Sequence, residues 1–299
     1  MGHCVLRPCK TQLITDEPLA NSCRDDWNGR NQEVPNSRQL TFYALQHITN
    51  FLHRTTINHY LEEMARQLYD YWFVQFDFPD ENGRPYKSSG GKMAWNEKLK
   101  REIPERWEDG QLIDIANVTM GQSPDGSSYN VSGKGVLFYQ GSTDFGVRFP
   151  KARLYTIEPT RFAKKGEILM SVRAPVGAIN IANNDCCIGR GLSAMNSKIG
   201  SITHLYYLLN GMKNIFDSKN AVGTTFGSIT KDELCLTPII KPSLSIVEQF
   251  EKICSQVFDR QMSINNEIES LIKQRDDLLP LLMSGQVSVT QLNNDLSNG

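Results

Sequence analysis

The residues that most often carry out chemistry in proteins occur here in patterns that match no common catalytic motif. The sequence has no G-x-x-x-x-G-K-[ST] loop, no G-x-G-x-x-G, no H-E-x-x-H and no G-x-S-x-G. His47, His53 and His59 recur every six residues, a spacing that puts them on different faces of a helix. The adjacent Cys186 and Cys187 would point to opposite faces of a strand, so we expect packed, inert thiols. We therefore expect no catalytic residue and no metal site.

Lysine and arginine offer a different chemistry, the neutralisation of phosphates. The whole chain has 32 basic and 33 acidic residues, a net charge of −1. Residues 126–231 alone hold 13 basic and 5 acidic residues, a net charge of +8, which leaves −9 on the remainder. Phosphate contacts supply the largest sequence-independent part of nucleic-acid affinity. The basic stretch therefore predicts a face that binds a polyanion, with an ordinary solvated surface as the alternative.

Two long helices are expected to position this stretch. Apolar residues spaced by three and four, without Pro or Gly, predict a helix over 39–76. An apolar repeat every seven residues predicts a second helix over 243–285. If both helices start from the same side of the intervening domain, they run antiparallel and pair. The expected helix-pairing residues are Ile57, Leu61, Met64, Leu68, Phe250, Val257, Ile264, Leu271 and Leu278.

Residues 77–242, between the helices, show a mixed pattern. Short β-prone runs at 136–139, 168–172 and 178–181, separated by glycines, predict strands, and an apolar face predicts a helix over 201–217. The predicted fold class is α+β: one mixed α/β domain with a twisted sheet, flanked by two long helices that pair as an antiparallel coiled coil.

The two ends of the chain fit neither pattern, so we expect a poorly structured lead-in at 1–38 and a tail at 286–299. The seven cysteines are odd in number and include no C-x-x-C pair, which favours a reducing compartment. No apolar run reaches the roughly 18–20 residues of a membrane span, and no secretory signal opens the chain. The expected location is the cytoplasm, with no membrane partner.

Several short sequence motifs occur along the chain in a characteristic order. The first helix leads into Gly83-Arg84-Pro85-Tyr86-Lys87-Ser88-Ser89-Gly90-Gly91. Three turns follow, at Gly121-Gln122-Ser123-Pro124, Gly166-Glu167-Ile168-Leu169 and Gly223-Thr224-Thr225. The exit runs from Pro242 through Glu248-Gln249 and the heptad helix to Ser284-Gly285. From about residue 57 to 289, this order resembles the specificity (S) subunit of type I restriction–modification enzymes, with one target recognition domain.

The resemblance implies a DNA-reading protein without chemistry of its own. Family members carry two target recognition domains, each reading one half of a bipartite site in double-stranded DNA. They direct methyltransferase (modification) subunits, which use S-adenosylmethionine, and a restriction subunit, which uses ATP and Mg²⁺, so no cofactor is implied in this chain. Here residues 1–38 stand where another recognition domain would be. We therefore expect a half-subunit or truncated product that forms a homodimer or pairs with a second recognition domain.

Sequence reading by such a domain uses arginine forks on guanine and polar side chains on loops that approach the DNA closely. The Gly-rich loops 121–130 and 223–228 suit this role, with ordinary hairpin turns as the alternative. The DNA-binding candidates are Gln122, Ser123, Tyr129, Asn130, Arg148, Arg153, Arg173, Arg190, Lys219, Thr224 and Thr225.

Two interpretations of other classes stay open. One is a DNA-acting nuclease or methyltransferase with an unrecognised site in the basic stretch. The other is an assembly scaffold that does not bind DNA, in which only the helices matter. Catalysis by the purified chain would indicate the first, and the absence of any DNA affinity would indicate the second.

Overall fold

The structure is a computed structural model that describes residues 37–213, 216 and 227–283. The chain divides into two compact units, one of residues 51–272 and one of residues 1–50 with 273–299. The second unit, as far as it is described, consists of two helix ends. The first unit is larger than the predicted domain of residues 77–242, because helix side chains on both sides of that domain belong to the same core. Among the described residues, no helix is both long and apolar enough to cross a membrane.

The long helices are α2 (Ser37–Tyr69) and α7 (Leu244–Met283). A π-helical turn, η2 (Asp70–Val74), continues α2. The helices therefore occupy nearly the ranges that their apolar spacing predicts, 39–76 and 243–285.

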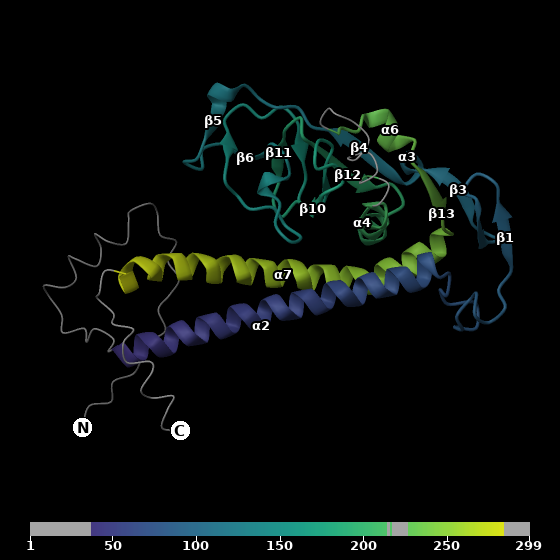
Figure 1. The fold of residues 1–299 in the computed structure, drawn as a ribbon, viewed down its shortest axis with the longest axis horizontal. Helices are drawn as coiled ribbons and strands as arrows, with labels where there is room; N and C mark the ends of the chain where they lie inside the picture. The colour runs from purple at the N-terminus through teal and green to yellow at the C-terminus, as the bar shows by residue number, and fades with distance from the viewer. Residues whose placement is uncertain (1–36, 214–215, 217–226, 284–299) are drawn as a thin grey trace, which may run out of the picture. The chain divides into compact units, whose positions relative to one another are not determined.

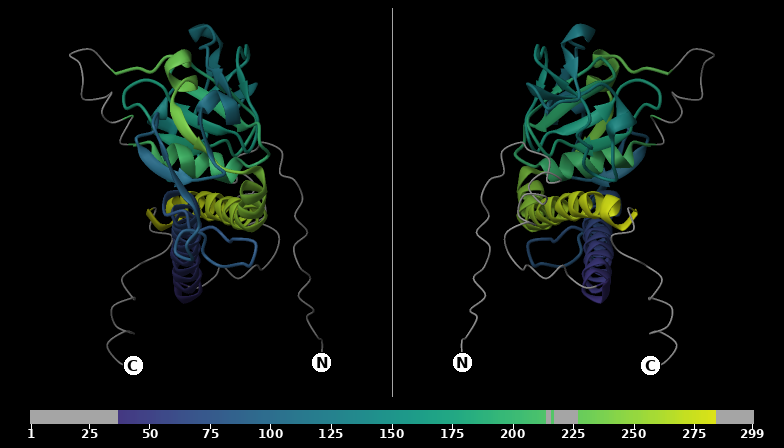
Figure 2. Two further views of the ribbon diagram at one scale, coloured as in Figure 1. Left: turned by 90° about the vertical axis from the view of Figure 1, so that its right-hand side faces the viewer. Right: turned by 90° about the vertical axis from the view of Figure 1, so that its left-hand side faces the viewer.

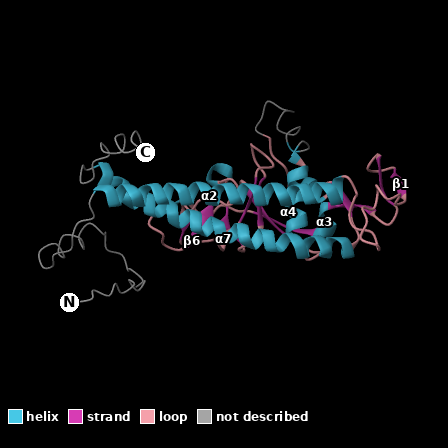
Figure 3. Ribbon diagram, turned by 90° about the horizontal axis from the view of Figure 1, so that it is seen from below, coloured by secondary structure: helices cyan, strands magenta, loops and turns pink. Residues whose placement is uncertain are grey.

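Within residues 51–272, α2 and α7 lie side by side and run in opposite directions (Figures 1 and 3). Arg54 Nε lies 2.7 Å from Glu267 Oε2. Further along, the side-chain amide of Gln261 donates to Glu62 Oε2 over 3.0 Å. From the first contact to the second, the residue number rises on α2 and falls on α7, so the two helices run antiparallel.

The predicted helix-pairing side chains do not all pack in the same way. Phe250 and Ile264 are fully buried, and a further set is half-buried, namely Ile57, Leu61, Leu68, Val257 and Leu271. The prediction for Met64 is wrong: its side chain is 52% exposed because it lines an open groove with Ile253 instead of packing under α7. The side chain of Leu278 lies outside the described residues. Coiled-coil packing stays a prediction, because these cross-helix contacts are polar pairs and one aromatic cluster.

Residues 77–242, called the central domain below, contain two main sheets. A four-stranded antiparallel sheet has the order β10-β9-β12-β4. A five-stranded sheet has the order β5-β7-β6-β11-β8, with β11 parallel to β6. The strands of the first sheet are β4 (Ala116–Met120), β9 (Ile168–Ser171), β10 (Ile179–Ile181) and β12 (Leu192–Ser197). Those of the second are β5 (Tyr129–Asn130), β6 (Val136–Tyr139), β7 (Tyr155–Thr156), β8 (Phe162–Ala163) and β11 (Cys186–Ile188).

Shorter elements connect the sheets to the long helices. Strand β3 (Glu108–Gln111) pairs with β13 (Pro238–Lys241), so the entry to the central domain lies beside its exit. Strands β1 (Met93–Asn96) and β2 (Arg101–Pro104) form a separate hairpin. Shorter helices are α3 (Leu112–Ile115), α4 (Ile202–Gly211) and α6 (Lys231–Cys235), and the 3-10 turns η3 (Gly126–Ser128) and η4 (Ser142–Asp144) also occur. Helix α4 is shorter than the predicted 201–217, because Met212 already leaves helical geometry.

The core joins the central domain to both long helices through aromatic rings. The ring centroid of Phe73, on η2, lies 5.1 Å from that of Phe250 on α7 and 4.6 Å from that of His204 on α4. His204 is 1% exposed, and burial lowers the pKa of its imidazole to about 4. In both views of Figure 2 the central domain lies on the α7 side of the helix pair. The central domain therefore packs directly on the two long helices.

Candidate nucleic-acid interface

The first predicted reading loop, residues 121–124, is fastened to the loop that joins β11 to β12. The amide of Gly121 donates to Leu192 O and that of Gln122 donates to Ile188 O, each over 2.9 Å. In the other direction, the amide of Arg190 donates to Ser123 Oγ over 3.1 Å. A Cβ at Gly121 would lie 2.1 Å from the carbonyl oxygen of Gly189, so only glycine allows this approach. Main-chain bonds thus set the shape of both loops.

Two more contacts hold the same loop from its other side. The phenol of Tyr129 donates to Pro124 O over 3.0 Å, and its ring centroid lies 4.8 Å from that of Phe138, with the two planes tilted by 32°. The hydroxyl of Thr160 donates to Gln122 O. Tyr129 therefore supports the loop, whereas Gln122 is exposed to solvent.

Arg173 joins this group from the segment just after strand β9, where it forms an isolated β-bridge with Ser228. The amide of Val172, just before it, donates to the carbonyl of Gly191, just after Arg190, over 2.9 Å. Arg173 and Arg190 therefore stand at the same end of the β9–β12 ladder, and both are exposed. We call Gln122, Ser123, Arg173 and Arg190 the reading cluster, because it combines the donor and acceptor types that recognise base edges.

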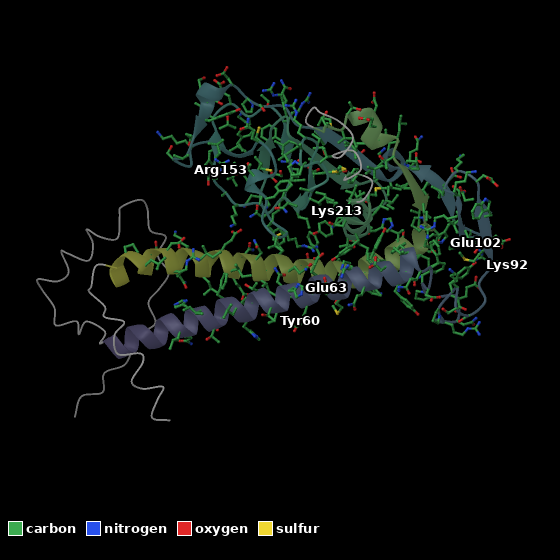
Figure 4. The ribbon with its side chains drawn as sticks, in the orientation of Figure 1. Tyr60, Glu63, Lys92, Glu102, Arg153 and Lys213 are labelled. Carbon is green, nitrogen blue, oxygen red and sulfur yellow. The ribbon has the colours of Figure 1, made fainter. Side chains whose placement is uncertain are left out.

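Asn130 and Arg153 have local partners. Asn130 accepts from the amide of Lys134 over 3.0 Å and donates to its carbonyl over 2.9 Å, which closes a tight turn. Arg153 Nε donates to Asp144 Oδ1 over 2.7 Å, and this bond raises the pKa of the guanidinium. Figure 4 shows Arg153 on the central domain. Its side chain is 60% exposed, so it can still meet a phosphate, whereas Asn130 shapes the turn.

The prediction that Arg148 contacts DNA is wrong. Its side chain is 5% exposed and forms an ion pair with Glu62 of α2. The sequence places Arg148 in a basic stretch, but the fold turns it inwards towards the long helices. Lys219, Thr224 and Thr225 lie outside the described residues, as do residues 217–226 as a whole.

The comparison with known families bears directly on this arrangement. The family described as "Type I restriction modification DNA specificity domain" matches residues 104–274, more than half of the chain. The chain belongs to this family. The matched segment of this specificity domain contains the whole reading cluster and the loops that hold it.

Individual relatives of the specificity domain agree. The putative type I restriction enzyme MjaX specificity subunit of Methanocaldococcus jannaschii is 35% identical over 195 residues, which are 63% of this chain and 45% of that protein. The MjaIX specificity subunit of the same organism is 28% identical over 254 residues, 79% of this chain and 55% of that protein. The chain spans about half the length of these curated relatives.

A solved structure shows the same fold. The crystal structure of the type I restriction–modification system S subunit from M. genitalium gives a TM-score of 0.52 at 17% identity, covering 78% of this chain and 56% of that one. This likeness concerns the fold alone. Among the described residues, no group of three or more His, Cys, Asp or Glu side chains could hold a metal ion.

Several residues that support these contacts were not predicted from the sequence. Thr160 holds the Gln122 carbonyl, and Asp144 orders Arg153. Glu62 pairs with Arg148, and Gln261 donates to the same Glu62 carboxylate. Apart from Asp144, which is nine residues from Arg153, these residues are distant from their partners along the chain, so no local pattern marks them. Only the glycines of the reading loops gave a usable signal, because close approach demands them.

Proposed function

We propose that the chain reads DNA sequence for a type I restriction–modification enzyme and performs no catalytic step of its own. The observation that carries the proposal is the reading cluster: Gln122, Ser123, Arg173 and Arg190 at one end of the β9–β12 ladder, inside the segment that matches the specificity family.

The chemistry of the cluster suits the major groove. An arginine fork bonds O6 and N7 of guanine, and a glutamine amide bonds N6 and N7 of adenine. Other exposed cations of the central domain, such as Lys134 and Arg153, would neutralise phosphates and fix the register. Because main-chain bonds hold the loops of Gln122 and Arg190, little ordering would be needed on binding.

The proposed partners are type I methyltransferase subunits and a restriction subunit. In this scheme S-adenosylmethionine, ATP and Mg²⁺ bind to those partners, and the chain needs no cofactor. The names of the relatives, specificity subunits of type I restriction enzymes, support this. We further propose that the complex works in the cytoplasm, since the described cysteines are free thiols buried in the fold.

A bipartite site needs two readers, and the described residues hold one central domain. We therefore propose that the chain forms a homodimer or pairs with a second recognition domain. A homodimer would select an inverted repeat, because its two-fold axis places two identical clusters on the DNA. Light scattering that finds a strict monomer at tens of micromolar, with and without the selected DNA, would remove the homodimer.

The main test uses the purified chain and a library of random DNA duplexes. We expect selection of one motif with an affinity that falls as salt rises. We expect neither cleavage nor methyl transfer when ATP, Mg²⁺ and S-adenosylmethionine are added. Either activity in the pure chain would indicate an enzyme instead, and failure to bind DNA at any salt concentration would indicate a scaffold.

A matched set of variants locates the surface. Arg173→Ala and Arg190→Ala should both weaken binding to the selected duplex. Arg66→Ala is the control, because Arg66 is an exposed arginine on α2 that pairs with Glu63 over 2.7 Å, outside the cluster. Equal losses in all three variants would show a general charge effect and no defined interface.

A further inference from the structure

The buried Arg148 starts from a loop that is firmly attached to the sheet. The amide of Gly146 donates to Asn180 Oδ1 over 3.0 Å, and Asn180 Nδ2 donates back to Gly146 O over 3.1 Å. The carbonyl of Arg148 accepts from the amide of Ile181 over 2.8 Å. Asn180 and Ile181 belong to β10, so the backbone of Arg148 moves with the central domain. Its side chain extends towards the long helices.

The guanidinium of Arg148 ends among three different helices. Its central carbon lies 4.4 Å from the ring centroid of Tyr206 on α4 and 5.4 Å from that of Phe258 on α7. Its charge is paired with Glu62 of α2, and the same carboxylate accepts from Gln261 of α7 over 3.0 Å. One cation thus joins the central domain to both long helices at once.

Polar contacts continue on either side of this pair along α7. Glu251 accepts from the hydroxyls of Ser201 and Thr203 at the start of α4. Further on, Asn183 Nδ2 donates to Glu269 Oε1 over 3.1 Å. Three α7 residues that make these contacts with the central domain lie on one face of the helix, next to the heptad row of Phe250, Val257 and Ile264. They are Glu251, Phe258 and Glu269. Gln261, which donates to Glu62 of α2, lies beside them.

These polar contacts depend on the direction and distance between two groups, so they can fix the orientation of one part of the fold on another. Apolar burial is non-directional and tolerates sliding or tilting of one packed surface on another. A buried charge is strongly unfavourable unless an opposite charge lies directly beside it. Sliding or tilting the central domain on the helices would therefore separate Arg148 from Glu62 and leave a buried charge without its ion-pair partner.

We infer that Arg148 and Glu62 are positioning residues that fix the angle of the central domain on α2 and α7, and with it the place of the reading cluster relative to the helices. The inference rests on the proposed DNA-reading function. Neither residue would touch DNA. Their loss would leave the bases read by the cluster unchanged and would loosen the spacing between the half-sites that a paired reader accepts.

The variants are Glu62→Gln, Arg148→Met and the double variant Glu62→Gln/Arg148→Met, made in the full chain. The matched control is Glu63→Gln/Arg66→Met, which removes an exposed ion pair of the same type on the same helix. The double variant guards against misfolding, because replacing both members leaves no unpaired buried charge. Thermal unfolding identifies the variants that fold.

Two measurements follow. The first is the distance distribution between spin labels on noncanonical residues at Thr119, on β4, and Asn266, on α7, measured without DNA. We expect a broader distribution in the folded variants and an unchanged one in the control. The second is selection from a library in which the half-site spacing varies. We expect the variants to select the wild-type bases but to lose the preference for one spacing.

The outcomes separate the two proposals. Folded variants with the wild-type distance distribution and the wild-type spacing would overturn the positioning role. Variants that select different bases would also overturn it, because that result places Arg148 in the reading surface. Wild-type protein that selects no DNA would defeat the proposed function, while the distance measurement would still decide whether the pair fixes the domain.

Discussion

Replacing Arg190 with alanine tests the reading cluster most directly. The amide of Arg190, which holds Ser123, is retained in the variant, so the loop should keep its shape. Among the described residues, the guanidinium has no acidic partner that it would have to leave on binding DNA. A fork on guanine is worth about 1–3 kcal/mol, so we expect roughly a 5- to 150-fold loss of affinity for the selected duplex.

The assay is fluorescence anisotropy with the selected duplex and with duplexes changed at one base pair each, at several salt concentrations. Discrimination should relax at one base pair of each half-site. A base contact predicts little change in the salt dependence, whereas a phosphate contact predicts a slope smaller by about 1 with discrimination intact. Arg153→Ala should have a weaker effect, because Arg153 already shares its charge with Asp144. A folded Arg190→Ala protein with wild-type affinity, discrimination and salt slope would refute the assignment.

Three further predictions concern the framework. Phe250→Ala should lower the free energy of unfolding by about 3–5 kcal/mol in urea titrations, because Phe250 is fully buried against the aromatic cluster; a loss below about 1 kcal/mol would contradict that packing. The unfolded chain takes up a proton on His204 below about pH 6.5 and the folded chain only near pH 4, so acidification through this window should remove about 3 kcal/mol of stability. His204→Leu should flatten that part of the pH profile, and an unchanged profile would show that His204 is not the group responsible. Gly121→Ala should force the two reading loops apart and lower both the melting temperature and DNA affinity, at about 1–3 kcal/mol of stability; a variant that melts and binds like the wild type would disprove the close approach to Gly189.

The parts of the fold that could be predicted are those with a local signature. The spacing of Phe250, Val257 and Ile264 is a property of one helix, and α7 follows from it. Strands β6, β9 and β10 likewise appear as short β-prone runs between glycines. Composition alone located the basic stretch that carries Arg173 and Arg190 of the reading cluster.

The parts that could not be predicted depend on which distant residues meet. Arg148 and Arg190 are both arginines in the same basic stretch, yet one is buried against Glu62 and the other is exposed. Nothing near Arg148 in the sequence marks its partner on α2. Met64 fits the apolar spacing of α2 as well as Leu68 does, and both line the same open groove, but Met64 is 52% exposed whereas Leu68 is half-buried. Periodicity shows that a face is apolar and does not show what covers it.

The two neighbouring contact faces of α7 restrict how the length of this helix can change. Each residue turns an α-helix by about 100°, so one residue inserted between Glu251 and Glu269 would rotate every later contact away from its partner on the central domain. Seven inserted residues would nearly restore the faces but would move them about 10 Å along the axis, past Asn183 and Arg148. Insertions and deletions in α7 are therefore compatible with this fold only outside that segment. The contacts of Glu251 and Glu269 with the central domain therefore fix the number of residues between them.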